Sequence, residues 1–168
     1  MKYSPFIGIV LAMFIAWKKK ERTDFTGRWL LDTSQAINLP QVYTRLDSVM
    51  MNVRQHGDSI FVVTEMSSAG RRVKTPEALY TIGDEEQYRE DTAVGMKRLT
   101  RGSWSNEGSM FTVTNRIAQR SRSGELAYTQ TDVWDLPRPD ELRIAMTLVT
   151  ADSHAAPTQR RVFRRLKQ

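Results

Sequence analysis

Apolar and polar residues alternate in short segments along most of the chain, beyond an amino-terminal apolar stretch. Residues 48–55 show the pattern clearly, because Val49, Met51 and Val53 fall on one face of an extended chain and polar residues lie between them. The sequence His56-Gly57-Asp58 then supplies a tight turn into another alternating segment, residues 59–66. These two segments predict a β-hairpin.

The same signals predict roughly eight to ten strands, and no segment has the 3.6-residue period of a long amphipathic helix. The predicted strands cover residues 25–31, 48–55, 59–66, 71–75, 78–82, 92–104, 109–120, 127–136, 141–150 and 160–166. Residues 33–39 are expected to form a brief helical turn or loop before Pro40.

The number and spacing of these strands are typical of a β-sandwich or β-barrel. At 168 residues the chain has the length of one domain. Short turns favour pairing between strands that follow one another in the chain, and closing the sheet removes exposed edges. We therefore predict an all-β domain over residues 24–168, a single antiparallel up-and-down β-barrel, preceded by an N-terminal hydrophobic leader helix over residues 1–23.

The leader contains an uncharged, mostly apolar run at residues 4–17, which basic residues flank on both sides. A helix of 14 residues spans about 21 Å, which is short of the roughly 30 Å of a bilayer core. A run of this length after a positive start is typical of a secretory signal. We expect an exported protein, periplasmic or membrane-tethered through residues 4–17; the alternative is an uncleaved anchor whose following end stays cytoplasmic.

The end of this run, residues 14–20, resembles a bacterial lipoprotein signal whose acceptor cysteine would stand at Trp17. The chain has no cysteine at all, which also excludes disulfides, thiolate metal sites and cysteine nucleophiles. A natural loss, a sequence error and an engineered block to lipidation would each explain the tryptophan. Cleavage, lipidation and retention of the leader therefore stay open.

The net charge of +6 comes largely from the leader. Without residues 1–24 the chain has 20 basic and 17 acidic residues, a charge of only +3. Several arginines crowd residues 160–167, but alternation along a strand places them on both faces. We therefore expect no nucleic-acid partner.

No motif in the sequence predicts an enzyme. His56 and His154 lie far apart in expected turns and lack the spacing of a zinc site. A nucleophile elbow, a phosphate-binding glycine loop and a dinucleotide fingerprint are all missing from the sequence. The sequence predicts no catalytic residue, no metal site and no cofactor.

Residues 25–29, Phe-Thr-Gly-Arg-Trp, resemble the G-x-W signature of lipocalins and the wider calycin group. Residues 131–136, 140–144 and 161–165 resemble the closing strands of small exported lipocalin-like bacterial proteins, so the resemblance covers approximately residues 24–167. It implies that Trp29 closes one end of the barrel and that a basic side chain of the last strand, Arg164 or Arg165, packs across it. Gly27, Trp29 and Arg164 are therefore the expected closure residues.

Two neighbouring strands predict a candidate ligand site. Alternation places on one face of each strand Tyr128, Gln130, Asp132, Trp134 and Leu136, and then Leu142, Ile144, Met146 and Leu148. If both faces point inward, Asp132 needs a partner, because an isolated buried charge is costly, and Arg164 is the candidate. The expected ligand-binding residues are Tyr128, Gln130, Asp132, Trp134 and Met146.

Two functions follow from this arrangement. The first is a non-enzymatic, monomeric cell-envelope protein that binds a small hydrophobic or amphipathic ligand in the barrel. The alternative is a scaffold or interaction module whose loops, residues 120–124 or 152–157, contact a partner. In that case the aromatic residues and the methionines Met51, Met96, Met110 and Met146 fill a solid core.

Overall fold

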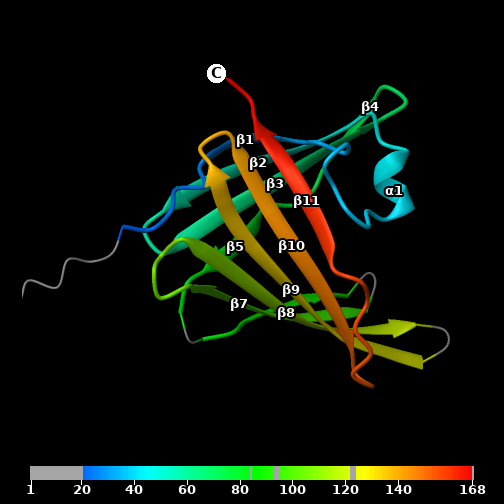
Figure 1. Ribbon diagram of the computed structural model, residues 1–168. Coiled ribbons are helices and arrows are strands. Elements are labelled where there is room, and N and C mark those ends of the chain that lie inside the picture. Colours follow the sequence, from blue (N-terminus) through cyan, green and yellow to red (C-terminus); the bar gives the residue numbers. More distant parts are fainter. Residues whose placement is uncertain (1–20, 84, 93–94, 122–123, 168) are drawn as a thin grey trace, which may run out of the picture.

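The computed structural model describes residues 21–83, 85–92, 95–121 and 124–167. The predicted leader helix and the lipidation position lie almost wholly outside these described residues. The strands are β1 (Gly27–Leu31), β2 (Ser48–His56), β3 (Ser59–Ser68), β4 (Arg71–Lys74), β5 (Ala78–Thr81), β6 (Gln87–Asp91), β7 (Met96–Trp104), β8 (Met110–Ser121), β9 (Gly124–Arg138), β10 (Glu141–Thr150) and β11 (Gln159–Arg165). A single short helix, α1 (Gln41–Thr44), lies in this part of the chain (Figure 1).

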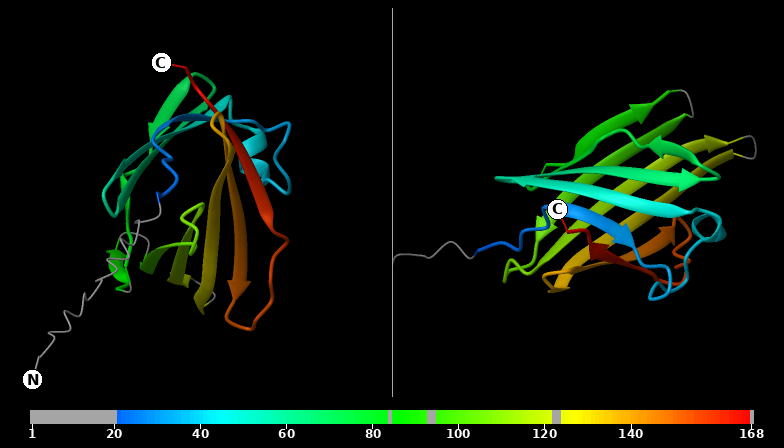
Figure 2. Two further views of the ribbon diagram at one scale, coloured as in Figure 1. Left: turned by 60° about the vertical axis from the view of Figure 1, so that its left-hand side comes forward. Right: turned by 90° about the horizontal axis from the view of Figure 1, so that it is seen from above.

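The strands form one antiparallel sheet in the order β4-β3-β2-β1-β11-β10-β9-β8-β7-β6, with β5 also paired to β3. Except around β5, which pairs with β3 and not with β4 or β6, neighbours in the chain are neighbours in the sheet. The first strand pairs with the last through Trp29 opposite Arg165 and Leu31 opposite Phe163. The sheet bends over itself so that β2 and β3 cross above β8 and β9 (Figure 2). The predicted all-β meander is confirmed.

The sheet is not closed into a barrel, so that part of the prediction is wrong. Strands β4 and β6 stand at the two ends of the order and are not paired with each other. Among the described residues, the chain beyond β5 pairs with β7 through an isolated parallel bridge between Ile82 and Gly102, where the Gly83 N–H donates to the Gly102 carbonyl at 3.4 Å. We call the interval between β5 and β6 the seam.

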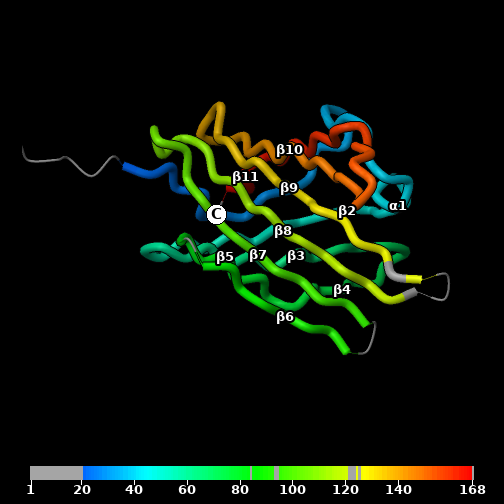
Figure 3. The backbone as a smooth tube through the Cα atoms, turned by 90° about the horizontal axis from the view of Figure 1, so that it is seen from below, coloured from blue at the N-terminus to red at the C-terminus, as the bar shows by residue number. Residues whose placement is uncertain are grey.

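The residues at the seam explain why pairing stops there. Pro76, between β4 and β5, has no backbone N–H to donate to a ladder. Strand β6 is short and mostly exposed, and it ends in Arg89, Glu90 and Asp91 at one margin of the sheet (Figure 3). Short, charged edge strands resist further pairing.

Two elements differ from the sequence prediction. Strand β6 was not expected, because Tyr88 is its only large apolar residue; it forms by pairing with β7, from Gln87 opposite Thr100 to Asp91 opposite Met96. Residues 33–39 form the expected turn and loop, in which the Gln35 N–H donates to the Asp32 carbonyl at 3.3 Å, whereas helix α1 after Pro40 was not predicted.

Aromatic rings fill one end of the interior. Phe25 stacks on Trp104 with ring centroids 5.5 Å apart and meets Trp134 edge-on at 5.8 Å, and Phe111 packs against both tryptophans. Such contacts stabilise the core beyond the apolar area that they bury. Of the methionines expected in the core, Met51 and Met146 are buried and Met96 is partly buried. Met110 is 44% exposed, so its predicted core position is wrong.

Arg165, and not Arg164, covers Trp29. Its guanidinium lies 4.3 Å from the indole centroid and also donates to the carbonyls of Thr26 and Pro139. Gly27 makes room for this contact, since its φ is +152° and a Cβ there would lie 3.0 Å from Arg165 Nη1. Trp29 is fully buried and its Nε1 donates to a backbone carbonyl at 2.9 Å.

Arg164 points to the opposite face, where it belongs to an ion-pair cluster around Glu141. The Glu141 side chain is only 1% exposed and accepts hydrogen bonds from Arg138, Arg143 and Arg164. Arg164 also reaches Asp32 at 3.4 Å. These arginines hold the pKa of Glu141 down at about 2, the Arg138 hydrogen bond being the largest cause. The expected pair between Arg164 and Asp132 is therefore not formed.

Candidate functional site: a polar pocket inside the curved sheet

The predicted faces of β9 and β10 both point into the concave side of the sheet. Trp134 lies opposite Ile144, and Asp132 lies opposite Met146. Ile144, Met146 and Trp134 are all at most 6% exposed, which identifies their face as the inner one. Gln130 belongs to the same face by alternation.

These residues border an interior cavity of about 170 Å³. Strands β2, β3, β5, β9, β10 and β11 and helix α1 contribute its lining, which consists of Tyr43, Val49, Met51, Thr64, Tyr80, Gln130, Asp132, Trp134, Ile144, Arg161 and Phe163. Of the predicted ligand residues, Gln130, Asp132 and Trp134 therefore line it. Met146 lies behind Arg161, and Tyr128 lies farther along β9 without lining this cavity.

Asp132 is the only carboxylate in the cavity lining. Its Oδ2 accepts a hydrogen bond from Gln130 Nε2 at 2.8 Å, and its Oδ1 is buried without a hydrogen-bond partner in the part of the chain that the structure describes. Burial raises the pKa of Asp132, and the Gln130 hydrogen bond, Arg161 and Arg98 oppose that rise. Arg161 and Arg98 thus supply the positive charge near Asp132 that was expected from Arg164.

Two arginines near Asp132 have poor hydrogen-bond partners. Arg161 directs Nη2 to the Met146 sulfur at 3.3 Å, and Arg98 directs Nη2 to the Met96 sulfur at 4.0 Å. A thioether sulfur is only a weak acceptor. The Nε atoms of both arginines are buried and have no acceptor among the described residues.

Some buried polar groups in the same interior are satisfied, whereas Trp104 Nε1, Trp134 Nε1, Asp132 Oδ1 and Gln159 Oε1 also lack a hydrogen-bond partner among the described residues. Thr100 and Asn115, buried on neighbouring strands, form a hydrogen bond of 2.8 Å between their side chains. Arg161 does gain a contact with Tyr43, whose ring centroid lies 5.0 Å from the guanidinium carbon. A ring stacked over the guanidinium accepts no hydrogen bond from the N–H groups, which lie in the plane of the guanidinium.

A second hollow, of about 480 Å³, lies at the seam. It is lined from one side by β3, β5 and the chain before β5, and from the other by β6 and β7. Thr64 and Tyr80 border both this hollow and the interior cavity. Burial is the largest cause that raises the pKa of Tyr80, and the nearby Asp132 raises it further. The positive charges of Arg98, Arg89 and Arg161 lower it. Tyr80 therefore stands between the seam and the polar interior.

Arg98 and Arg161 were not among the predicted site residues, although alternation offers a signal for each. The alternation that places Phe163 inside also places Arg161 inside, two residues earlier on β11. That signal was present, but arginine is usually exposed. For Arg98 the neighbouring Thr100, buried on the same face of β7, is the corresponding signal.

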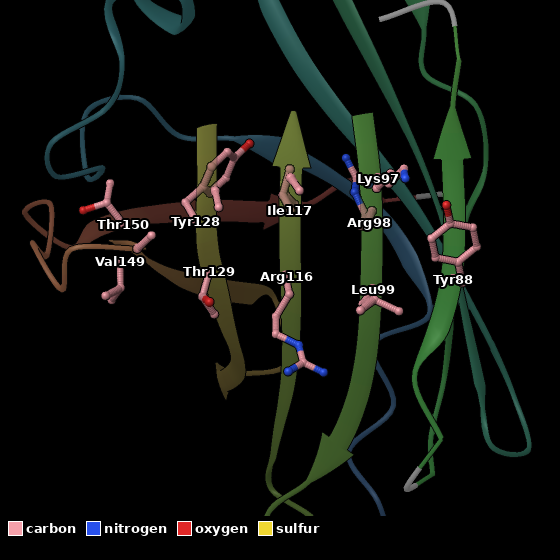
Figure 4. A pocket seen from close by; sticks show the side chains of 13 residues that line it. Tyr88, Lys97, Arg98, Leu99, Arg116, Ile117, Tyr128, Thr129, Val149 and Thr150 are labelled. Atoms are coloured by element: carbon pink, nitrogen blue, oxygen red, sulfur yellow. The ribbon is translucent and has the colours of Figure 1, made fainter. Parts of the chain in front are cut away.

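A third hollow, of about 790 Å³, is an open groove on the outer face of β6 to β10. Figure 4 shows Tyr88, Leu99, Arg116, Thr129 and Val149 on successive strands along it. Tyr88 is 56% exposed, and Arg116 forms an ion pair with Glu86. Arg98 and Tyr128 also border this groove, so the predicted ligand residue Tyr128 lies here and not at the interior cavity.

Among the described residues, no group of three histidine, cysteine, aspartate or glutamate side chains is placed to hold a metal ion. No helix in the described part of the chain is long and apolar enough to span a membrane. No family model and no curated sequence matches the chain.

Proposed function

We propose that this protein is a non-enzymatic, lipocalin-like binding protein of the cell envelope, which holds a small hydrophobic or amphipathic molecule inside its curved sheet. The observation that carries the proposal is the interior cavity, in which apolar walls surround buried polar atoms without partners. Ligand sites typically combine an apolar lining with a few polar groups that orient the ligand.

The dimensions of the two hollows support a ligand that enters through the seam. The interior cavity of about 170 Å³ is smaller than the roughly 300–1,000 Å³ of typical ligand sites. The seam hollow of about 480 Å³ falls within that range and shares Thr64 and Tyr80 with the cavity. A ligand placed at the seam with one end past Tyr80 would use both.

The chain order supports the lipocalin-like part of the proposal. A meander in which the first strand pairs with the last is the arrangement of an up-and-down barrel, here with one seam left open. The cell-envelope location rests on the leader sequence alone, the apolar run of residues 4–17 between basic residues.

Native mass spectrometry of the protein purified from its own host tests ligand binding. We expect a non-covalent adduct that is released on denaturation. Thr64→Phe, which places a ring where the two hollows meet, should remove the adduct. Thr112→Phe, on β8 and outside the lining of either hollow, is the matched control and should retain it. Protein without an adduct, and without fatty-acid binding in titrations, would show that the proposal is wrong.

The outer groove favours a second candidate, an interaction module of the envelope. Its apolar lining includes the exposed Tyr88 and Val149. In this case Tyr88→Ser should weaken cross-linking to an envelope partner and leave any interior ligand unaffected. Unchanged cross-linking after this substitution, and after deletion within residues 152–157, would count against an interaction module.

A further inference from the structure

Two partly buried arginines, Arg161 and Arg98, have hydrogen-bonding capacity that the described residues do not use. Arg161 and Arg98 each direct an Nη2 at a methionine sulfur, and their buried Nε atoms have no acceptor among the described residues. A guanidinium has five N–H donors and is always charged. Leaving such donors unsatisfied away from water is costly. The cost would be recovered if a ligand supplied the missing acceptors.

The unpartnered atoms beside the cavity are mostly donors. Among the buried side-chain atoms without a partner in the described part of the chain, Arg98 Nε, Arg161 Nε, Trp104 Nε1 and Trp134 Nε1 are donors, while Asp132 Oδ1 and Gln159 Oε1 are acceptors. Arg161, Trp134 and Asp132 line the interior cavity, and Arg98 lines the seam hollow. A ligand that satisfies this set must therefore bring acceptors more than donors. Carboxylate, phosphate and sulfate groups do so, because their oxygens only accept when they are ionised.

The charges at the seam also favour an anion. Arg89 lies directly opposite Arg98 on paired strands. Like charges in this position destabilise a sheet. Arg89 has no ion pair with any residue that the structure describes, although it borders the seam hollow. A bound anion would relieve the repulsion between the two arginines.

The carboxylates nearby do not neutralise these arginines. Glu77 pairs with Arg54, and Glu90 accepts a hydrogen bond from Tyr88. Asp91 is engaged elsewhere in the structure. Asp132 is close enough to influence the charges of Arg98 and Arg161, but it forms an ion pair with neither at a direct hydrogen-bonding distance.

We propose that the ligand has an acidic head group, which Arg98 and Arg161 bind beside Tyr80, and an apolar part that lies in the seam between β5 and β6. This inference rests on the proposed function and names its ligand class. The apolar residues available at the seam are Val62, Pro76, Ala78 and Met96. Arg161 and Arg98 approach the head group from β11 and β7, on opposite sides of the bent sheet.

Isothermal titration of the full chain tests the head group with four probes: octanoate, 1-octanol, acetate and inorganic phosphate. We expect octanoate to bind and 1-octanol, which has the same chain without the charge, to bind at least about tenfold more weakly. Acetate and phosphate separate recognition of a free anion from recognition of an acidic amphipathic molecule. We expect both to bind more weakly than octanoate, because they lack the apolar part.

Substitutions test which side chains contribute to octanoate binding. Arg161→Gln and Arg98→Gln should each weaken octanoate binding by about tenfold or more, and Arg161→Lys should restore part of the loss because it keeps the charge. Arg116→Gln is the matched control, since it removes the same charge from the outer face of the same sheet. The comparison of octanoate with 1-octanol uses the unaltered protein, so the test stands even where a variant fails to fold.

The outcomes distinguish the two proposals. If 1-octanol binds as tightly as octanoate and Arg161→Gln changes neither, the acidic head group is wrong while the proposed interior binding function stands. If no probe binds, both proposals fail. If acetate or phosphate binds as tightly as octanoate, the anion site stands and the amphipathic ligand of the proposed function is contradicted.

Discussion

Glu141→Gln removes the charge at the centre of the arginine cluster and keeps the size of the side chain. Glu141 is 1% exposed, and its oxygens accept from Arg143 Nε at 2.7 Å, from Arg164 Nη1 at 2.6 Å and from Arg138. Its pKa lies at about 2 against an ordinary 4.5. That difference corresponds to about 3 kcal/mol of stabilisation of the charged form.

The expected loss of stability is smaller than this figure because water screens the partners. The arginine side chains are 31–58% exposed. Solvent screening reduces the energy of such pairs, while breaking a buried pair leaves unpaired charge behind. We therefore expect Glu141→Gln to lower the free energy of unfolding by about 2 kcal/mol at pH 7.

Urea denaturation across a pH series measures this effect and its sign. The pKa of Glu141 is lower in the folded than in the unfolded chain, so its contribution is complete above about pH 4.5 and disappears as the pH falls towards 2. The difference between the variant and the unaltered protein should shrink over the same interval. Glu86→Gln is the control, since among the described residues Glu86 forms an ion pair with the exposed Arg116. This substitution should cost under about 1 kcal/mol. A loss under about 0.5 kcal/mol for Glu141→Gln, or a difference independent of pH, would refute the reasoning.

Three further substitutions test the interior. Burial raises the pKa of Asp132, so the charged form of Asp132 destabilises the fold as the pH rises through that pKa. Asp132→Asn should therefore leave the free energy of unfolding at pH 7 equal or higher. A clear loss in urea denaturation would contradict this. Arg165→Met should cost about 0.5–2 kcal/mol and change Trp29 fluorescence, because the guanidinium over the indole is lost; an unchanged spectrum would argue against the contact. Gly102→Ala should cost about 1–3 kcal/mol, since a Cβ there would lie 2.9 Å from the Phe111 ring; an unchanged melting temperature would count against that packing.

Alternation with a period of two predicted most strands and their order, because strands that bury one face must alternate. It failed at β6, where Tyr88 is the only large apolar residue and pairing with β7 forms the strand. The prediction of a closed barrel failed for a related reason. Whether the last edge of a meander pairs depends on the charge and length of the edge strands, and one of these, β6, was not predicted.

The site was predicted in part. Gln130, Asp132 and Trp134 line the interior cavity because alternation along β9 correctly groups them with Ile144 across the sheet. The partner of Asp132 was assigned to Arg164, but one step along a strand turns a side chain to the other face. The face that holds Phe163 holds Arg161, and Arg164 joins Glu141 outside.

A crystal structure of the protein with octanoate tests the central claim most directly. The account predicts the carboxylate within hydrogen-bond distance of Arg161 and Arg98, close to Tyr80, with the hydrocarbon chain in the seam between β5 and β6. Octanoate bound only in the outer groove along Tyr88 and Val149, or an interior cavity that holds no octanoate at a saturating concentration, would contradict it.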